Sequence, residues 1–265
     1  MITETINEAY NKILKLILTD FKFETSPHGK ESNGYFPNSG EIQEILGAQI
    51  WITNPEDNLV YKTKDPKRDS QVNKHNQREI EVFDAGFIDS NIMAHHSTIW
   101  KLIENKSNQT INANYGYMVH HLRDTPDGIS QFEWAYRRLI EDKDTRQSYM
   151  HFNRVKDQYE GNNDQPCTVY CQFIIRDNFL YLFSYMRSND VMFGTPYNLG
   201  YFNHLSKRMF TLLKKHYPEL TGRQLVHNAT SLHMYKRHLK RVEKMVYGND
   251  IKTLASQISR TKEKL

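Results

Sequence analysis

The stretch from Gln165 to Asn198 constrains the fold of this 265-residue chain more than any other. Two apolar runs, Thr168 to Ile175 and Phe179 to Met186, are joined only by Arg176-Asp177-Asn178. A short polar connection between two runs of β-prone residues predicts a tight antiparallel hairpin. We therefore expect a sheet built around this hairpin, with a cysteine at position 167 opening its first strand.

The remaining apolar segments predict further helices and strands. Ile6, Tyr10, Ile13 and Ile17 recur at helical spacing, so we expect an amphipathic helix over residues 3–19. We expect further helices over residues 72–84, 97–105, 129–142 and 201–215 and after Ser231, and further strands over residues 45–53 and 147–155. A loop rich in Pro, Gly, Ser and Asn spans residues 26–40. The chain is long enough to bury one sizeable core, so the pattern predicts a single domain over residues 1–265 with an α+β fold, a largely antiparallel or mixed sheet flanked by helices.

Net charge and the lengths of the apolar segments indicate which kinds of molecule this chain is suited to bind. The net charge of +4 is small for a chain that coats nucleic acid, although it suits a compact anion such as a phosphate. No segment has the apolar length of a signal peptide or a membrane span. We therefore expect a cytoplasmic protein with neither a nucleic acid nor a membrane as its partner.

Cysteine and histidine usage argues against disulfides and metals. Cys167 and Cys171 lie four positions apart, which is a poor disulfide framework and too few thiols for a zinc cage. Adjacent histidines occur at positions 95–96 and 120–121, but neighbouring side chains point in different directions on a helix or a strand. The sequence predicts a reduced compartment and no metal.

Cys167 is the candidate nucleophile. A cysteine attacks an electron-poor carbon as a thiolate, so it needs cationic or hydrogen-bonding neighbours that lower its pKa, and Arg187 is a candidate for that part. Free cysteines are also common as small, inert core residues, a description that fits Cys171 better. For Arg187 and Ser188, an anion-binding pair and an ordinary surface salt bridge remain equally open on these residues alone.

Several short motifs, read together in their order and spacing, resemble the thymidylate synthase superfamily. They are Arg78 to Glu81, Asn114 to Gly116, Asp144 to Arg146, Pro166-Cys167, Arg187 to Val191, Gly194 to Asn198 and Ser231 to Tyr235. The resemblance covers roughly residues 40 to 240. The superfamily includes the folate-dependent thymidylate synthases and the phage enzymes that hydroxymethylate deoxypyrimidine nucleotides.

The resemblance implies a covalent mechanism. Cys167 would add to C6 of a pyrimidine nucleotide, and C5 would then attack a one-carbon unit carried by methylenetetrahydrofolate, a co-substrate. Glu79 matches the carboxylate that organises proton transfers, and Tyr115 matches the tyrosine that helps to remove the C5 proton. Trp100 matches the indole that lines the folate pocket, and would otherwise be a core residue. Glu81 points elsewhere if residues 79–81 are helical, so we expect it at the surface.

The same resemblance implies how the nucleotide and folate are held. Arg187 and Ser188 match the phosphate contacts made within one subunit, and Arg146 matches the contact made by the partner, which implies a homodimer with shared active sites. The further matches are Asp190 for the nucleotide and the folate, Gly194 for the folate, and His233 and Tyr235 for an ordered water and the sugar hydroxyl. His233 would otherwise be a satisfied core histidine.

Two positions depart from the superfamily's phosphate site. Gln147 follows Arg146 where a second arginine is usual, and the loop before Glu44 reads Asn38-Ser39-Gly40 where another arginine is common. Lys30 is the candidate replacement for the missing charge. These departures imply weaker or rearranged phosphate binding, and they keep open a homologue that binds a nucleotide without turning it over, or one that acts on an altered substrate.

Asn198 is the predicted determinant of base choice. A carboxamide offers a donor and an acceptor, and so can pair with O4 and N3–H of uracil. The cytidylate hydroxymethylases carry aspartate at this position, so Asn198 favours a uracil nucleotide, with deoxyribose or ribose left open as its sugar. Met186 and Asn189 look more like the hydroxymethylase branch, and residues 255–265 do not resemble the apolar tail with which thymidylate synthases cover the folate. We therefore expect 5-hydroxymethylation of deoxyuridylate, with thymidylate synthesis as the alternative.

Overall fold

The computed structural model describes residues 1–25, 40–106 and 108–248, so the expected loop over residues 26–40 with Lys30, and the tail over 255–265, lie outside the described residues apart from Gly40. The helices are α1 (Ile6–Thr19), α2 (Pro66–Ala85), α3 (Ser90–Ala94), α4 (Ile99–Ile103), α5 (Gln131–Glu141), α6 (Thr195–Leu213) and α7 (Leu239–Tyr247). The strands are β1 (Ile2–Thr3), β2 (Phe23–Thr25), β3 (Ile42–Ile52), β4 (Tyr149–His151), β5 (Thr168–Arg176), β6 (Phe179–Met186), β7 (Asn189–Asp190) and β8 (Gly222–Tyr235).

The eight strands found in the described residues belong to one mixed sheet. The strand order is β1-β3-β8-β6-β5-β4, with β2 paired to β3 and β7 paired to β8. The β3–β8, β5–β6, β4–β5 and β2–β3 pairs are antiparallel, whereas β8 runs parallel to β6 and to β7, and β1 runs parallel to β3. The expectation of an α+β fold with a mixed sheet flanked by helices is confirmed.

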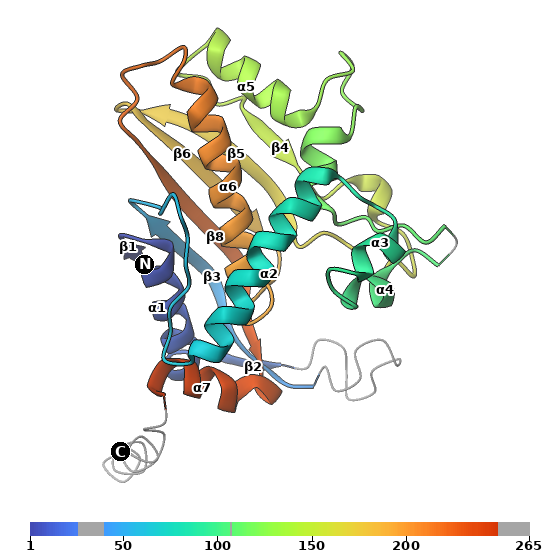
Figure 1. Cartoon of the computed structure of the whole chain (residues 1–265), viewed down its shortest axis with the longest axis vertical. Helices are drawn as coiled ribbons and strands as arrows, with labels where there is room; N and C mark the ends of the chain where they lie inside the picture. Colours follow the sequence, from blue (N-terminus) through green and yellow to red (C-terminus); the bar gives the residue numbers. More distant parts are fainter. Residues whose placement is uncertain (26–39, 107, 249–265) are drawn as a thin grey trace.

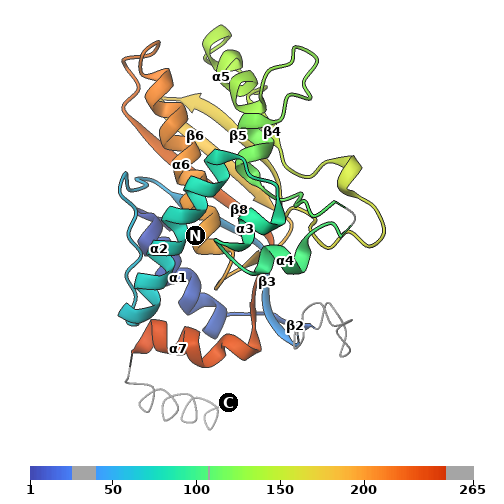
Figure 2. The same ribbon diagram turned by 45° about the vertical axis from the view of Figure 1, so that its right-hand side comes forward.

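Helices cover one face of this sheet. In Figures 1 and 2, α1, α2, α5 and α6 lie in front of the strands, and α7 crosses below α1. Along β6 the side chains alternate between buried positions, which face these helices, and half-buried positions on the other face. The largest fully buried side chains include Tyr10, Tyr61, Tyr201 and Phe173, so the core between helices and sheet is rich in aromatic residues. Within the described ranges, no helix is long and apolar enough to cross a membrane.

Local sequence signals explain where several elements begin and end. Thr5 caps α1 by accepting a hydrogen bond from the backbone N–H of Glu8 at 3.1 Å. In α2, Asp65 is the N-cap, a proline follows it, and Gly86 ends the helix in the left-handed conformation at φ 70°. The hairpin predicted between β5 and β6 is confirmed, and it turns at Asp177 and Asn178, whose φ angles are 48° and 60°.

Other boundaries differ from the sequence predictions. The helix expected over residues 72–84 begins six residues earlier, whereas the expected strand over 147–155 shortens to Tyr149–His151. A helix follows Ser231, as expected, but it begins only at Leu239, because β8, a strand that the sequence analysis did not predict, continues to Tyr235. The central position of β8 explains the error: its conformation is set by pairing with β3 and β6, which are distant in sequence.

Candidate active site

Pairing between β5 and β6 places Cys167 opposite Arg187. Thr168 pairs with Met186 where β5 begins and β6 ends, and just beyond this pair the Arg187 N–H donates to the Cys167 carbonyl at 2.9 Å. The expected nucleophile and the expected anion-binding arginine therefore lie side by side. Tyr115 reaches the same point, since its hydroxyl oxygen accepts a hydrogen bond from the Thr168 N–H at 3.2 Å.

The Cys167 thiol is not activated in this state. Burial raises its pKa, the nearby Arg187 guanidinium lowers it less, and the carboxylates of Asp164 and Asp190 raise it further. The expectation that Arg187 lowers the pKa of this thiol is confirmed, but the effect of burial is larger and raises the pKa overall. Burial also raises the pKa of the Tyr115 phenol, with the neighbouring Cys167 as the next cause, so this hydroxyl is neutral.

The Arg187 guanidinium lies along the loop that precedes Cys167. Its Nε donates to the Pro166 carbonyl at 3.1 Å, and its Nη2 donates to the Gln165 carbonyl at 2.8 Å. The residue is exposed and Ser188 beside it is half-buried, so both can meet a ligand from solvent. These bonds to neutral carbonyls hold the arginine without neutralising it. Its charge therefore remains available to an anion.

Short strand β7 brings Asp190 beside His233. The two residues are Cα partners in the parallel β7–β8 pair, and the Val191 N–H donates to the His233 carbonyl at 2.8 Å. Burial raises the pKa of Tyr235, the Asp190 carboxylate raises it further, Arg237 lowers it, and Cys167 has a smaller raising effect. The Tyr235 ring centroid lies 5.6 Å from that of His233. His233 is buried, with Nδ1 3.3 Å from the Ser231 hydroxyl, so its context also suits a core histidine.

A tight turn joins Asp190 to the start of α6. One carboxylate oxygen of Asp190 accepts hydrogen bonds from the N–H groups of Met192 at 2.6 Å and Phe193 at 3.0 Å. Gly194 is required here, because a Cβ at this position would lie 2.9 Å from the Asp190 carbonyl oxygen. One oxygen of Asp190 thus holds the turn, and no hydrogen bond to its other oxygen occurs within the described ranges.

Asn198 projects from the first turn of α6. Its N–H donates to the Gly194 carbonyl at 2.9 Å, and the residue is half-buried. Among the residues that the structure describes, none hydrogen-bonds to its carboxamide. A half-buried carboxamide without a protein partner is suited to pairing with a ligand edge.

Glu79 and Trp100 lie on the helical side of the site. The Glu79 side chain is only 14% exposed and is close enough to Tyr197, at the start of α6, to raise that phenol's pKa, after the larger effect of burial. Trp100 is buried with its ring centroid 6.3 Å from that of Phe83, one helical turn beyond Glu79. Its indole N–H has no partner within the described ranges.

The expected surface position of Glu81 is confirmed, and so is the expected core position of Cys171.

Two histidines that the motifs did not single out flank Glu79. His75 Nε2 lies 3.8 Å from a Glu79 carboxylate oxygen, and the His75 and His96 rings have centroids 4.3 Å apart. Burial lowers the pKa of His96 to about 4, with smaller effects from His75 and Arg78, so His96 is neutral at pH 7. The spacing of His75 four residues before Glu79 was a readable signal for a pair on one helix face.

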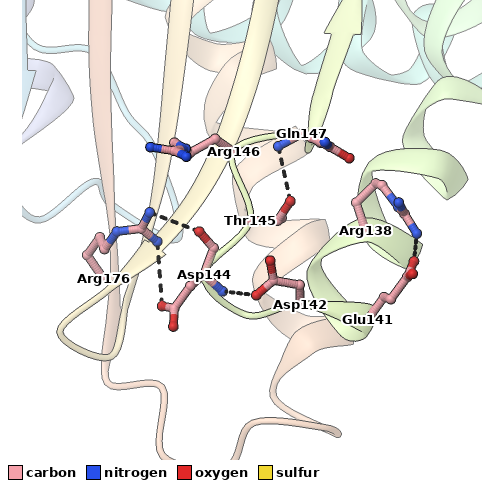
Figure 3. Close-up of a pocket in the computed structure, with 8 residues that line it drawn as sticks. All are labelled: Arg138, Glu141, Asp142, Asp144, Thr145, Arg146, Gln147 and Arg176. Carbon is pink, nitrogen blue, oxygen red and sulfur yellow. Dashed lines mark hydrogen bonds and ion pairs between the residues drawn. The ribbon is translucent and has the colours of Figure 1, made fainter.

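Arg146 lies at the other end of the sheet from Cys167. It lines a cavity of about 440 Å³ with Arg138, Arg176 and several polar residues of the segment after α5 (Figure 3). Arg176 ends β5, the strand that Cys167 precedes, and donates to the Asp144 carbonyl at 3.0 Å. A nine-residue strand spans roughly 30 Å. Arg146 therefore does not reach Cys167 of its own chain. Gln147 beside it is exposed.

Comparisons with known proteins support the resemblance. The family model described as thymidylate synthase matches residues 70–265. The chain is 26% identical over 174 residues to the deoxycytidylate 5-hydroxymethyltransferases of Enterobacteria phages T6 and T4, covering 63% of this chain and 69% of each relative. It is 27% identical over 133 residues to a thymidylate synthase of Bacillus licheniformis, covering 49% of this chain and 45% of that relative.

Proposed function

The chain belongs to the thymidylate synthase family, whose reaction is one-carbon transfer to a pyrimidine nucleotide, and we propose that it hydroxymethylates C5 of deoxyuridylate. The proposal rests on the residues that meet at the open end of the hairpin, where β5 begins and β6 ends. There, Cys167 and Arg187 are joined by a backbone hydrogen bond, and Tyr115 bonds to the next residue of the strand. A nucleophile, a cation for the phosphate and a proton carrier thus converge on one place.

Cys167 adds through Sγ to C6 of the base, and the electron pair moves to C5. The raised pKa of the free thiol means that the thiolate is a minority form until the substrate enters. Arg187 is the cation that favours it, while also meeting the nucleotide phosphate with Ser188. Tyr115 then helps to remove the C5 proton. Its raised pKa keeps the phenol neutral, so the hydroxyl relays the proton and does not act as a phenolate base.

The residues that match the folate site are compatible with methylenetetrahydrofolate, the co-substrate that the family implies. The unpartnered indole N–H of Trp100 and the half-buried Glu79 carboxylate offer a donor and an acceptor on the helical side. Asp190 and Gly194 form the turn that leads into α6. When bound, the co-substrate supplies the one-carbon unit. Glu79 then organises the water whose oxygen adds to the carbon transferred to C5, after which Cys167 Sγ leaves C6 and the product is released.

Base choice rests on Asn198. The phage relatives are named for deoxycytidylate, which makes cytidylate the second candidate. The free carboxamide of Asn198 favours uracil, because its donor and acceptor match O4 and N3–H, whereas a carboxylate has no donor. We expect Asn198→Asp to shift the ratio of kcat/KM from deoxyuridylate toward deoxycytidylate by roughly 10- to 100-fold, the effect of about 1–3 kcal/mol from one mispaired edge.

We also propose a homodimer in which Arg146 serves the partner's site. The sheet face away from the helices carries half-buried aromatic rings, with the Trp51 ring 6.1 Å from Tyr181 and Tyr170 stacked on Tyr185 at 4.4 Å. Such a face is suited to packing on a second copy. A mixture of Cys167→Ala and Arg146→Ala, each inactive alone, should recover about a quarter of wild-type activity, because half of the dimers would contain one intact site. No recovery after subunit exchange would argue against the shared site.

The decisive assay is incubation with deoxyuridylate or deoxycytidylate and methylenetetrahydrofolate. Mass spectrometry distinguishes a gain of CH2O from a gain of CH2, and absorbance detects dihydrofolate, which accompanies methyl transfer only. A CH2O product without dihydrofolate supports the proposal, and a CH2 product would identify a thymidylate synthase instead. Absence of both products with either nucleotide would favour the non-catalytic homologue.

A matched pair of variants tests the nucleophile. Cys167→Ala should abolish turnover while leaving nucleotide binding largely intact. Cys171→Ala alters a buried core thiol on the same strand and should retain activity where the protein folds. Turnover by Cys167→Ala would contradict the proposed mechanism.

A further inference from the structure

Three side chains of types that can bind metal ions lie close together on the helical side of the candidate active site. His75 and Glu79 lie one turn apart on α2, and His96 comes from the segment between α3 and α4. One ligand atom from each residue lies within 4.8 Å of the other two. The two imidazole rings are 4.3 Å apart between centroids and tilted by 36°. Residues from two elements thus converge where the motifs had suggested a carboxylate alone.

His96 lacks the partners that a buried imidazole needs. Both of its ring nitrogens are buried, and neither has a hydrogen-bond partner within the part of the chain that the structure describes. A neutral imidazole has one donor and one acceptor, and leaving both unpaired away from water is unfavourable. A ligand that accepts the nitrogen lone pair would relieve this, whereas the described part of the chain offers His96 the neighbouring ring of His75 and no hydrogen-bond partner.

The donor set fits a borderline divalent cation. Two imidazoles and a carboxylate bind zinc at about 2.0–2.2 Å in three-ligand sites that keep a fourth position open. Ligand atoms in such a tetrahedron are about 3.4 Å apart, and His75 Nε2 and Glu79 Oε1 are already 3.8 Å apart. The Tyr197 ring packs against the same imidazole, with its centroid 4.3 Å from that of His75. The three ligand atoms lie within 4.8 Å of one another, so binding an ion requires them to approach by up to about 1.4 Å.

We propose that His75, Glu79 and His96 form a binding site for a divalent transition metal, with Zn²⁺ the best match. This site is additional to the one-carbon chemistry and does not depend on it. Glu79 belongs to both, so an ion bound here withdraws its carboxylate from proton transfer. The metal site therefore gives the helical side of the active site a means of control by metal availability.

The test is a Zn²⁺ titration of the untagged full chain, without nucleotide or folate, against a chromophoric chelator. We expect one ion per chain, and at least about 10-fold weaker binding after His75→Ala or His96→Ala, since loss of even an outer-shell partner weakens metal binding by 10- to 100-fold. Glu79→Gln preserves shape and should weaken binding as well. His95→Ala is the matched control, because His95 is the exposed neighbour of His96 outside the cluster.

Circular dichroism of each variant separates lost binding from lost folding, and Glu79→Gln remains informative where an alanine variant fails to fold. The proposal is overturned if the wild-type chain does not compete with a chelator of micromolar affinity. It is equally overturned if folded His75→Ala, His96→Ala and Glu79→Gln all bind Zn²⁺ as His95→Ala does. Because the assay contains no substrate, neither result bears on the one-carbon reaction.

Discussion

His227 should make the stability of this protein depend on pH in a way that one variant can isolate. It lies fully buried on β8, with Nε2 3.2 Å from the Asn189 carboxamide oxygen and Nδ1 2.8 Å from the Ser184 hydroxyl. The Asn189 oxygen also accepts from the Thr195 hydroxyl at 2.6 Å. Since that oxygen is an acceptor, Nε2 carries the proton and Nδ1 accepts from Ser184. The neutral imidazole therefore links β8 to the turn that holds Asp190.

Burial lowers the pKa of His227 from its ordinary value of 6.5 to about 4 in the folded chain. Between these values the unfolded chain binds a proton that the folded chain does not, so stability is fully present above pH 6.5 and falls as the pH drops toward 4. Between pH 7 and pH 5 the linkage from this one group amounts to about 2 kcal/mol of unfolding free energy. That is a large part of the stability of an ordinary domain.

The assay is urea unfolding at several pH values for the wild type and for His227→Gln, whose carboxamide can donate to Asn189 but does not titrate. The variant should be less stable at pH 7 and should lose about 2 kcal/mol less than the wild type on going to pH 5. His96 and His120, whose pKa values are also lowered, contribute equally to both proteins. Parallel losses in the two proteins would refute the assignment to His227.

Three further outcomes are expected. Tyr61→Phe should cost about 1–2 kcal/mol in urea unfolding, because the buried Tyr61 hydroxyl donates to the Pro196 carbonyl at 2.5 Å and that acceptor would be left unpaired. Gly116→Ala should lower the thermal midpoint by an amount equivalent to about 3 kcal/mol, since its Cβ would lie 1.8 Å from a backbone oxygen of α2; an unchanged midpoint would contradict the close approach. Iodoacetamide should label Cys167 slowly at neutral pH, and still more slowly after Arg187→Gln, as followed by mass spectrometry; faster labelling would show that the arginine does not favour the thiolate.

The elements that were predicted correctly are those with local causes. The β5–β6 hairpin depends on a two-residue turn between alternating runs, and α1 depends on an apolar stripe after a capping threonine. Strand β8 was missed because both of its edges are paired, to β3 and to β6, so that buried positions do not alternate cleanly with exposed ones along it. Its partners, rather than its own residues, select the extended conformation.

In the candidate site, too, features with local causes are predictable from the sequence, and features that depend on distant contacts are not. The sequence predicted Cys167 beside Arg187, because a hairpin's register follows from its turn. It did not predict the raised pKa of that thiol, which depends on how much of the fold surrounds the sulfur. Nor did it predict that His96 meets His75, because the two rings come from segments whose approach is a matter of tertiary packing. The sequence thus indicates which charged residues lie close together within one motif. It does not indicate how deeply a side chain is buried or which motifs contact one another.

The length of β5 supplies an argument for the shared active site. Cys167 stands just before this strand and Arg176 ends it, with Arg146 in the same cavity as Arg176. Pairing with β6 along the strand holds it extended, so no rotation of side chains can close the gap of roughly 30 Å. If Arg146 contacts the phosphate at all, it does so in another copy of the chain. Loss of turnover in Arg146→Ala, with an unchanged thiol reactivity of Cys167, would be the signature of that arrangement, whereas a change in both would indicate damage within one chain.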